Sequence, residues 1–468
     1  MLHLPRVMVA APSSGSGKTM ITCGILQALK NRGLEPASFK CGPDYIDPMF
    51  HSRVIGAQSR NLDTFFTEEK TTRHLFARTA VTADISVLEG VMGIYDGIGG
   101  VSSRASSYDL ATVTDTPVLL VLNAKGMSLS LIPMIQGYVE YQKRFGKAVI
   151  RGVILNQTTK MTYQLLKEKI ESETGIRLYG YVPRLTECAV ESRHLGLVTP
   201  DEIEDLQQRL QRLSRELEAS LDLDGILALA GEAADYEDGE LNTPEAVRRL
   251  LDTVPQEKVR IGVAMDEAFC FYYQDNLDLL SALGAEIVPF SPVHDRNLPE
   301  SLDGILLGGG YPELYAGELA ENETIKEQIR RAIDRGLPYL AECGGFMYLH
   351  ESMEDMEGNT YPMCGCIHGK SYLTPKLSRF GYISLQTGTG QLLPGGQVIR
   401  GHEFHYFDST DPGEDYTAEK PGGRRAWTCI HGNGHSAAGY PHLYYWSNPV
   451  FAASFIKCAG AYRKTYKE

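Results

Sequence analysis

The first half of the chain alternates short apolar runs with longer segments of helical periodicity. Apolar residues dominate positions 7–10, 85–88, 116–122 and 148–155, and helical patterns lie between them. Nearly continuous apolar runs of this length are typical of parallel strands covered on both faces. Strand, helix and strand in repetition therefore predict an α/β domain with a doubly wound parallel sheet.

The pattern changes in the middle of the chain and then starts again. Residues 199–257 carry a charged helical pattern followed by a polar, acidic stretch, whereas apolar strand patterns resume at 258–265. We therefore expect an α/β domain at 1–198, a helical and acidic linker region at 199–257, and a second α/β domain at 258–468.

Composition excludes several classes of protein. The 468 residues are 43% hydrophobic and 22% charged, as is usual for a globular protein, and the net charge of -14 argues against a nucleic-acid partner. No apolar run approaches the roughly 20 residues that span a bilayer, and the N-terminus lacks the long apolar region of a signal peptide. Nine cysteines suit reduced thiols better than a disulfide framework. We therefore expect a cytoplasmic protein that acts on small molecules and has no membrane partner.

The stretch SSGSGKT at 13–19 lies between an apolar run and a helical pattern. A glycine-rich turn placed there points backbone N–H groups and a helix N-terminus at a polyphosphate. Lys18 would reach the β- and γ-phosphates and Thr19 would bind Mg2+, as in a P-loop, although Pro12 stands where the usual pattern has glycine. The residues expected to bind the nucleotide phosphates are Ser14, Gly15, Ser16, Gly17, Lys18 and Thr19.

Polar side chains follow three more of the predicted strands. Asp44 and Asp47 stand behind a Gly-Pro turn, and Glu89 ends an apolar run. Carboxylates at strand ends beside a P-loop are suited to hold Mg2+ together with Thr19, although a solvated turn would also explain the two aspartates. Asn156 ends another strand, where its amide would read a base edge or simply terminate the strand.

The stretch AECGG at 341–345 carries the candidate chemistry of the second domain. It joins an apolar strand pattern to a helical pattern, and such a sharp turn presents a nucleophile, here Cys343, at a helix N-terminus that favours the thiolate. The Gly344 N–H lies beside the position of an oxyanion, and the glycines at 308–310 offer a second donor. A buried structural cysteine is the alternative, which the flanking glycines disfavour.

A nucleophilic thiol needs a base, and several histidines in the C-terminal part qualify. His402 and His405 lie in GHEFH at 401–405, whereas His442 lies in GYPHLYY at 439–445. Spacing alone does not choose between these two clusters.

Nine stretches together resemble the cobyrinic acid a,c-diamide synthase family over nearly the whole chain. This combination is highly specific, because it joins a P-loop pattern to a cysteine turn and to several stretches that neither motif requires. The stretches are SSGSGKT at 13–19, CGPDYIDP at 41–48, NLD at 61–63, LEGVMGIYDG at 88–97, RHLGL at 193–197, AFCFYY at 268–273, LGGGYPE at 307–313, AECGG at 341–345 and GHEFH at 401–405.

The resemblance implies a fold and an activity. Residues 1–198 would form a dethiobiotin-synthetase-like ATP-binding domain, and residues 258–468 a flavodoxin-like class I glutamine amidotransferase domain. The implied reaction is ATP-dependent amidation of the a and c side-chain carboxylates of cobyrinic acid in cobalamin biosynthesis, through acyl phosphates attacked by ammonia from glutamine. The expected partners are thus a corrinoid, glutamine and ATP with Mg2+, and the oligomeric state is left open.

The resemblance also implies roles for individual residues. His442 is the implied base for Cys343, Asn156 contacts adenine, and Lys40 neutralises phosphate charge together with Lys18. The wider amidotransferase class has a glutamate two residues after the histidine, where this chain has Tyr444, so the third member of the triad is left open. The implied oxyanion donors are Gly344, Gly309 and Gly310.

Two alternatives follow from the same motifs. Close relatives amidate hydrogenobyrinic acid or nickel-sirohydrochlorin through the same two domains, and no motif here identifies the macrocycle. The first domain is also similar to partitioning-type P-loop ATPases, which act as nucleotide-switched binding proteins. Those ATPases carry an extra lysine where this chain has Ser13, and they do not need a Cys-Gly-Gly turn.

Overall fold

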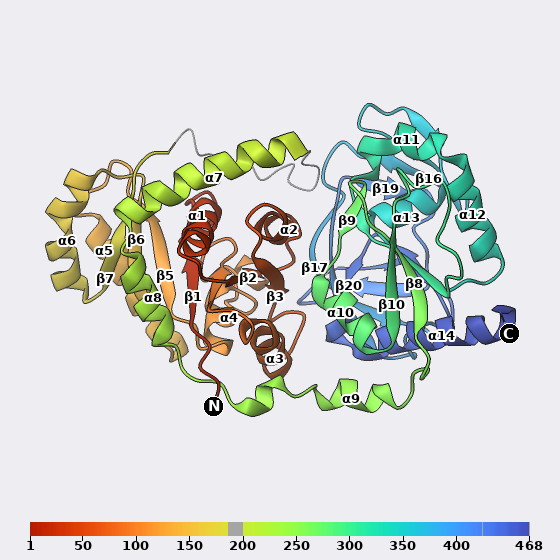
Figure 1. The fold of residues 1–468 in the computed structure, drawn as a ribbon, viewed down its shortest axis with the longest axis horizontal. Coiled ribbons are helices and arrows are strands. Elements are labelled where there is room, and N and C mark those ends of the chain that lie inside the picture. The colour runs from red at the N-terminus through yellow and green to blue at the C-terminus, as the bar shows by residue number, and fades with distance from the viewer. Residues whose placement is uncertain (186–199, 424, 468) are drawn as a thin grey trace. The chain divides into compact units, whose positions relative to one another are not determined.

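A computed structural model of the protein describes residues 1–185, 200–423 and 425–467. It divides the chain into two compact units, Met1–Asn242 and Thr243–Glu468 (Figure 1). The RHLGL stretch at 193–197, which contributes to the family resemblance, and the predicted boundary at 198 lie outside the described residues.

The first unit is built on one parallel sheet. Its strands are β1 (Arg6–Ala10), β2 (Pro36–Cys41), β3 (Gln58–Leu62), β4 (Ile85–Glu89), β5 (Val118–Asn123), β6 (Ile150–Asn156) and β7 (Arg177–Val182). They lie in the order β3-β2-β4-β1-β5-β6-β7, and every pairing is parallel. The order reverses direction beside β1, and ligands of doubly wound sheets bind at the carboxyl ends of the strands near such a point. The predicted doubly wound sheet is confirmed.

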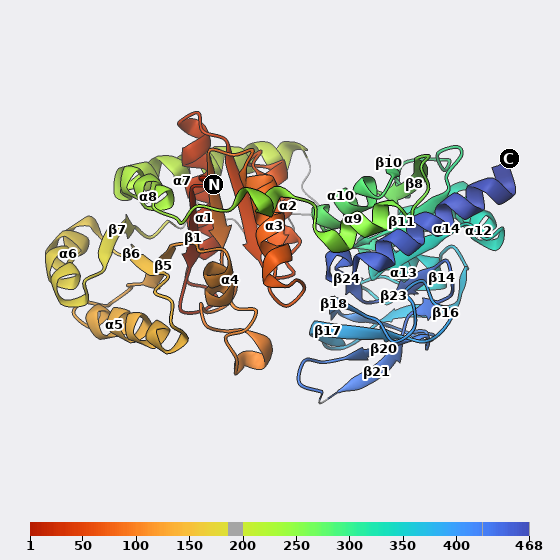
Figure 2. The same ribbon diagram turned by 90° about the horizontal axis from the view of Figure 1, so that it is seen from below.

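Helices cover both faces of this sheet (Figure 2). They are α1 (Lys18–Asn31), α2 (Ile46–Arg53), α3 (Glu69–Ala80), α4 (Ser107–Val113), α5 (Leu131–Gln142), α6 (Lys160–Thr174), α7 (Pro200–Ser220) and α8 (Leu223–Gly231), with a 3-10 turn η4 (Asp238–Leu241).

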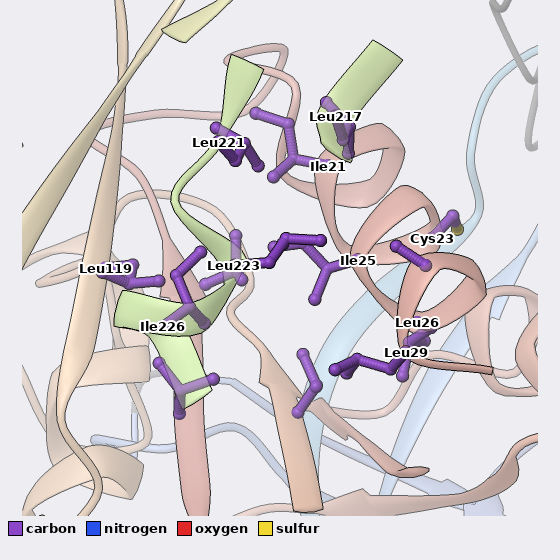
Figure 3. Packing of buried hydrophobic residues seen from close by; sticks show 14 of the residues in the cluster. Ile21, Cys23, Ile25, Leu26, Leu29, Leu119, Leu217, Leu221, Leu223 and Ile226 are labelled. Carbon is purple, nitrogen blue, oxygen red and sulfur yellow. The ribbon is translucent and has the colours of Figure 1, made fainter. Parts of the chain in front are cut away.

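The region predicted as a linker is divided differently in the structure. Helix α7 packs along α1, and a Cβ on Gly24 of α1 would lie 2.3 Å from Leu217 Cδ1. Leu217 belongs to the buried core beneath α1, together with Leu221, Leu223 and Ile226 (Figure 3). Residues of the predicted linker up to Asn242 thus fold with the first unit, because the charged helix carries an apolar stripe that α1 buries.

The acidic stretch after α8 is also anchored to the first unit. The buried Arg6 guanidinium donates to the carbonyl oxygens of Thr114 at 2.8 Å and Ala234 at 2.7 Å, and it lies 4.7 Å from the centre of the Tyr236 ring. Arg73 pairs with Glu240 at 2.8 Å. A buried arginine with carbonyl and aromatic partners keeps its charge satisfied. This segment is thus anchored through Tyr236 and Glu240, while Asp235, Glu237 and Asp238 stay exposed.

The second unit contains a central sheet that is parallel except at one edge. Its strands are β8 (Val259–Ala264), β10 (Ala285–Phe290), β11 (Gly304–Leu307), β13 (Tyr339–Glu342), β22 (His431–Gly432) and β23 (Ala437–Gly439). They lie in the order β10-β8-β11-β13-β23-β22, and only β22 runs antiparallel to its neighbour.

Further strands, most of them in antiparallel pairs, extend this unit beyond the predicted α/β pattern. They are β9 (Phe269–Phe271), β12 (Gly309–Gly310), β14 (His350–Glu354), β15 (Thr360–Pro362), β16 (Ile367–Leu373), β17 (Arg379–Thr387), β18 (Val398–His405), β19 (Phe407–Ser409), β20 (Tyr416–Glu419), β21 (Ala426–Cys429) and β24 (His442–Leu443). The largest of these additional sheets has the order β21-β20-β17-β18-β24 and brings His402 opposite His442.

Helices and 3-10 turns complete the second unit. They are α9 (Glu245–Leu251), α10 (Gln274–Ala282), η5 (Pro312–Tyr315), α11 (Ala316–Glu321), α12 (Glu323–Asp334), α13 (Gly344–Leu349), η6 (Tyr445–Ser447) and α14 (Pro449–Lys467). None of the helices in the described part of the chain is both long and apolar enough to cross a membrane.

Candidate active sites

The predicted P-loop connects β1 to α1 in the first unit. Gly15 and Gly17 have φ values of 74° and 94°, a left-handed conformation that glycine adopts at little cost. The Ser16 hydroxyl donates to the Ser13 carbonyl oxygen at 2.9 Å, which closes the turn. Gly17 caps α1, so the loop ends at a helix N-terminus. The loop thus has the backbone shape that binds phosphate groups.

Lys18 is buried beneath this loop. Its ammonium donates to the carbonyl oxygens of Ser13 at 3.0 Å and Met92 at 2.6 Å. Burial, helped by the nearby charge of Lys40, lowers the pKa of Lys18 to about 8. The lysine is therefore held by neutral carbonyl oxygens, which an anionic phosphate would outcompete.

Asn156 packs against the same loop. Its side-chain amide donates to the Ser16 carbonyl oxygen at 2.8 Å, and its oxygen accepts the Gln157 N–H at 2.9 Å. A Cβ on Gly17 would lie only 2.3 Å from the Asn156 amide nitrogen. The amide nitrogen thus holds the loop while the amide oxygen caps the adjoining backbone, and the contact with adenine stays a prediction.

The predicted carboxylates meet around Lys40. In the pairing of β2 with β4, Lys40 lies directly opposite Glu89, and its ammonium is 2.8 Å from Glu89 Oε1, 2.5 Å from Asp47 Oδ2 and 3.8 Å from Asp44 Oδ2. The Thr19 hydroxyl donates to Glu89 Oε1 at 2.6 Å. The structure therefore joins the P-loop to three carboxylates and a lysine that are up to 70 positions apart in sequence.

Burial and neighbouring charges set the ionisation of this cluster. Burial raises the pKa of Glu89 to about 7, although Lys40 opposes the shift. The pKa of Lys40 is raised because its carboxylate neighbours outweigh the effect of burial. Three acids share one lysine, and Glu89 Oε2 accepts no hydrogen bond from the described residues. The cluster thus carries an excess of negative charge that an added cation would neutralise.

The residues present fit Mg2+ bound together with a nucleotide. Among the described residues, no group of three or more His, Cys, Asp and Glu side chains is arranged to hold a metal by itself. Mg2+ in phosphate-transfer sites usually takes one or two carboxylates, phosphate oxygens and waters. Thr19 and Glu89 offer such a partial set, while Lys40 holds Asp47.

His51 extends the cluster, although no sequence motif marks it. Its Nδ1 lies 2.7 Å from the Ser38 hydroxyl and its Nε2 lies 3.6 Å from Glu89 Oε2. Burial lowers its pKa to about 4, so the ring is neutral at physiological pH. A histidine six residues into a helix gives no sequence signal for such a role, because the contact depends on how α2 packs on the sheet.

Cys343 occupies the predicted sharp turn between β13 and α13. Its backbone has φ 49° and ψ -104°, a strained conformation for a residue with a side chain, and its N–H donates to the Gly439 carbonyl oxygen at 2.9 Å. A Cβ on Gly345 would lie 2.2 Å from the Leu307 carbonyl oxygen, so only glycine allows the turn to pack there. This is the geometry of a strand-to-helix turn that presents a nucleophile.

The expectation that the helix N-terminus favours the thiolate is not met in this structure. Burial raises the pKa of Cys343, and the nearby carboxylates Glu313 and Glu342 raise it further. Helix α13 has only six residues, so its dipole is weak against that desolvation. The thiol is therefore neutral and needs a neighbouring base to become a nucleophile.

The glycine stretch after β11 lies against the cysteine turn. The Gly345 N–H donates to the Gly308 carbonyl oxygen at 2.9 Å, and a Cβ on Gly344 would lie 3.2 Å from the Gly310 nitrogen. Tyr272 fixes this stretch, since its hydroxyl accepts the Gly308 N–H at 2.8 Å. The backbone of 308–310 and that of Gly344 thus meet at one place, as the oxyanion prediction requires.

The His442 imidazole packs against the backbone of Gly309 in this site. A Cβ on Gly309 would lie 2.5 Å from His442 Cε1, so the imidazole covers the glycine. Burial lowers the pKa of His442 to about 3, which leaves a neutral ring able to accept a proton. Of the predicted residues, the structure brings Gly344, Gly309, Gly310 and His442 around the turn of Cys343.

The two histidine clusters that the sequence left open lie together. The rings of His402 and His442 stack with centroids 4.9 Å apart and an interplanar angle of 16°. His402 Nδ1 is 3.1 Å from the Tyr273 hydroxyl, whereas His405 stacks on Tyr440 at 4.1 Å. Both clusters therefore surround the same site, which the pairing of β18 with β24 brings about.

Comparison with known proteins agrees with this division into two units. A model of the CobQ/CobB/MinD/ParA nucleotide binding domain matches residues 7–197, and a model of the CobB/CobQ-like glutamine amidotransferase domain matches residues 260–450. A cobyrinate a,c-diamide synthase of Caldanaerobacter subterraneus subsp. tengcongensis is 38% identical over 463 residues, which are 98% of this chain and 99% of that protein.

The cobyrinate a,c-diamide synthases of Listeria innocua and Dehalococcoides mccartyi are equally similar. Each is 38% identical, over 95% and 97% of this chain and 97% and 98% of the respective relative. The chain belongs to the cobyrinate a,c-diamide synthase family. The predicted resemblance, the two-part α/β fold and the class of enzyme, a glutamine-hydrolysing ligase of cobalamin biosynthesis with an ATP-binding domain, are thereby confirmed.

Proposed function

We propose that the protein amidates the a and c side-chain carboxylates of cobyrinic acid, with ATP and glutamine as co-substrates. The observation that supports this most directly is the presence in one chain of a P-loop beside a buried acidic cluster and of a strained cysteine turn beside a neutral histidine. The first arrangement suits activation of a carboxylate, and the second suits release of ammonia.

In the first unit, ATP would bind with its phosphates on the N–H groups of residues 14–19. Lys18 would exchange the Ser13 and Met92 carbonyl oxygens for phosphate oxygens, and Lys40 would neutralise developing charge. Mg2+ held by Thr19 and Glu89, with Asp44 and Asp47 nearby, would supply further charge neutralisation. A substrate carboxylate oxygen would attack the γ-phosphorus, ADP would leave, and an acyl phosphate would result.

In the second unit, His442 would take the Cys343 proton as the sulfur attacks the amide carbon of glutamine. The Gly344 N–H and an N–H of Gly309 or Gly310 would stabilise the oxyanion. Collapse of this intermediate releases ammonia with the proton from His442, and water hydrolyses the thioester to glutamate. Ammonia then attacks the acyl phosphate, so that an amide and inorganic phosphate are formed.

The test is to incubate the purified protein with ATP, Mg2+, glutamine and one of three macrocycles. Cobyrinic acid should give mono- and diamides by mass spectrometry, with ADP, phosphate and glutamate released in matching amounts. Exclusive use of hydrogenobyrinic acid or nickel-sirohydrochlorin would replace the proposed substrate. ATP turnover that ignores glutamine and is stimulated by DNA or lipid vesicles would instead favour a partitioning-type ATPase.

A further inference from the structure

The residue two positions after His442 does not supply the orienting carboxylate. The Tyr444 ring is buried and packs edge-on against Tyr273, with centroids 5.1 Å apart and an interplanar angle of 76°. The Tyr444 N–H donates to the Arg400 carbonyl oxygen at 2.9 Å. The side chain at this position is thus part of an aromatic core, and the orienting group has to come from another element.

A buried carboxylate on a different strand lies beside His442. Glu342 is the last residue of β13, directly before Cys343, and its Oε2 is 3.9 Å from His442 Nδ1. The carboxylate also accepts hydrogen bonds from the Tyr445 hydroxyl, at 3.2 Å to Oε1, and from the Leu443 N–H. Glu342 is therefore held by the segment that carries His442.

That segment is itself clamped in place by α10. The Asn276 side chain donates to the Leu443 carbonyl oxygen at 2.8 Å and accepts the Tyr445 N–H at 2.8 Å. On the other side, β13 pairs with β23, with Glu342 opposite Gly439. Both partners of the pair between Glu342 and His442 thus sit on fixed backbone, which is what a positioning contact requires.

The direction of the imidazole supports the same assignment. Its Cε1 edge faces Gly309, so its two nitrogens lie on opposite sides of that edge. Nδ1 lies toward Glu342, which leaves Nε2 as the nitrogen that accepts the thiol proton. A contact of 3.9 Å between the Glu342 side chain and the neutral imidazole would shorten once the ring is charged, as catalytic hydrogen bonds often do when substrate binds.

We propose that Glu342 positions His442 and stabilises its imidazolium while Cys343 attacks glutamine. The thiol proton moves to Nε2, the Nδ1–H points at the carboxylate, and the proton later leaves with ammonia. This inference rests on the proposed roles of Cys343 and His442. Burial raises the pKa of Glu342 to about 8 because it disfavours the ionised carboxylate. Formation of the His442 imidazolium beside it would stabilise the ionised carboxylate, and the carboxylate would stabilise the imidazolium in turn.

Glu403 provides a matched control in the same domain. It is also a buried glutamate that lies 3.9 Å from a histidine Nε2, but its partner is His405 rather than His442. Both Glu→Gln substitutions keep the size of the side chain and remove one buried carboxyl group. A difference between them therefore reports on the histidine that each carboxylate faces.

The experiment compares Glu342→Gln, Glu342→Asp and Glu403→Gln by glutamine hydrolysis. Glu342→Gln should lower kcat on the order of 100-fold with KM within about twofold, because the acid–base step is impaired and glutamine binding is not. Glu342→Asp should recover part of kcat, and Glu403→Gln should stay within about fivefold of the parent. Thermal midpoints are measured for all three variants.

Two results would overturn the assignment. One is a folded Glu342→Gln protein with kcat close to that of the parent, and the other is an equal loss of kcat in Glu403→Gln. If Glu342→Gln fails to fold, Glu342→Asp decides, since a purely structural role would lower the thermal midpoint without lowering kcat. Glutamine hydrolysis that persists in Cys343→Ser would contradict the proposed function instead, so the two failures are distinguishable.

Discussion

The two candidate sites are built on the same local design and differ in how they treat charge. In both, a parallel strand ends in a glycine-containing turn that opens a helix, β1 to α1 in the first unit and β13 to α13 in the second. In the first unit, Lys40 shares buried ion pairs with Asp47 and Glu89. In the second, burial keeps Cys343 and His442 neutral.

This difference follows from the chemistry proposed for each site. A nucleotide brings several negative charges, so a site for it benefits from fixed cations and metal ligands that exist before binding. Release of ammonia starts from neutral glutamine, so charges arise only during the reaction and are passed between a thiol, an imidazole and backbone N–H groups. Substitutions in the buried charged cluster of the first site and in the neutral Cys343 site should therefore affect activity differently.

The largest expected effect distinguishes the two sites by the nitrogen source, glutamine or free ammonium, that still supports amidation. Cys343→Ser is nearly isosteric and should abolish amidation with glutamine, while amidation with a high concentration of ammonium at alkaline pH persists. Lys18→Ala should fail with either donor, because the carboxylate is no longer activated. Product formation by mass spectrometry with each donor checks both statements. A folded Cys343→Ser protein that binds ATP and cannot use ammonia at any concentration would place the thiol in the synthetase chemistry.

The next effect tests the acidic cluster. Glu89→Gln removes the carboxylate that accepts from Thr19 and pairs with Lys40, and amidation with either donor should fall by roughly 100-fold or more. Glutamine hydrolysis remains chemically possible, since Cys343 lies in the other unit. Glu35→Gln, an exposed partner of Lys30, is the control and should behave like the parent. Parent-like amidation by Glu89→Gln at saturating Mg2+ would remove Glu89 from the metal site.

Much of the fold was predictable because its signals are local. The apolar runs, the glycine turns and their alternation predicted parallel sheets in both halves, and the sheet orders agree with that expectation. The role of α7 was not predictable, because its charged residues dominate the composition while Leu213 and Leu217 pack on α1. The additional strands after Leu349 were also missed, since they are short and interrupted by polar residues.

The candidate sites show the same limit. The P-loop is contiguous in sequence, so its shape could be predicted from glycine positions alone. The placement of His402 next to His442 depends on the pairing of β18 with β24, which no local pattern encodes. Glu342 stood beside the predicted nucleophile in sequence, but its contact with His442 required the fold of a segment 100 residues later.

The third prediction addresses the glycine beneath His442. Gly309→Ala would place a Cβ only 2.5 Å from His442 Cε1, so the ring has to shift. A displacement on the order of 1 Å in a catalytic group costs about 100-fold, and kcat for glutamine hydrolysis should fall by roughly 10- to 100-fold. Gly317→Ala in α11, whose nearest neighbouring atom would be 3.9 Å away, is the control and should leave kcat unchanged. An unchanged kcat in Gly309→Ala would show that the ring is free to move there.

The smallest expected effect concerns stability in acid, where both units contain a buried neutral histidine. Burial lowers the pKa of His350 in the second unit to about 4, as it does for His51 in the first. His350 Nδ1 is 2.9 Å from the Phe346 carbonyl oxygen and Nε2 is 2.7 Å from the Ser409 hydroxyl, so the neutral ring is satisfied. The unfolded state therefore binds a proton near pH 6.5 that the folded state does not bind until about pH 4.

From this difference, the contribution of His350 to the free energy of unfolding is full above pH 6.5 and is lost as the pH falls toward 4. Between pH 7.5 and 5.5 the loss amounts to about 1 kcal/mol for this residue. His350→Gln should be less stable than the parent at pH 7.5 because it disturbs a packed site, but its stability should fall by about 1 kcal/mol less over this range. Urea unfolding at both pH values measures this, with the exposed His294→Gln as control. An equal pH dependence in His350→Gln and the parent would mean that His350 does not resist protonation in the folded state.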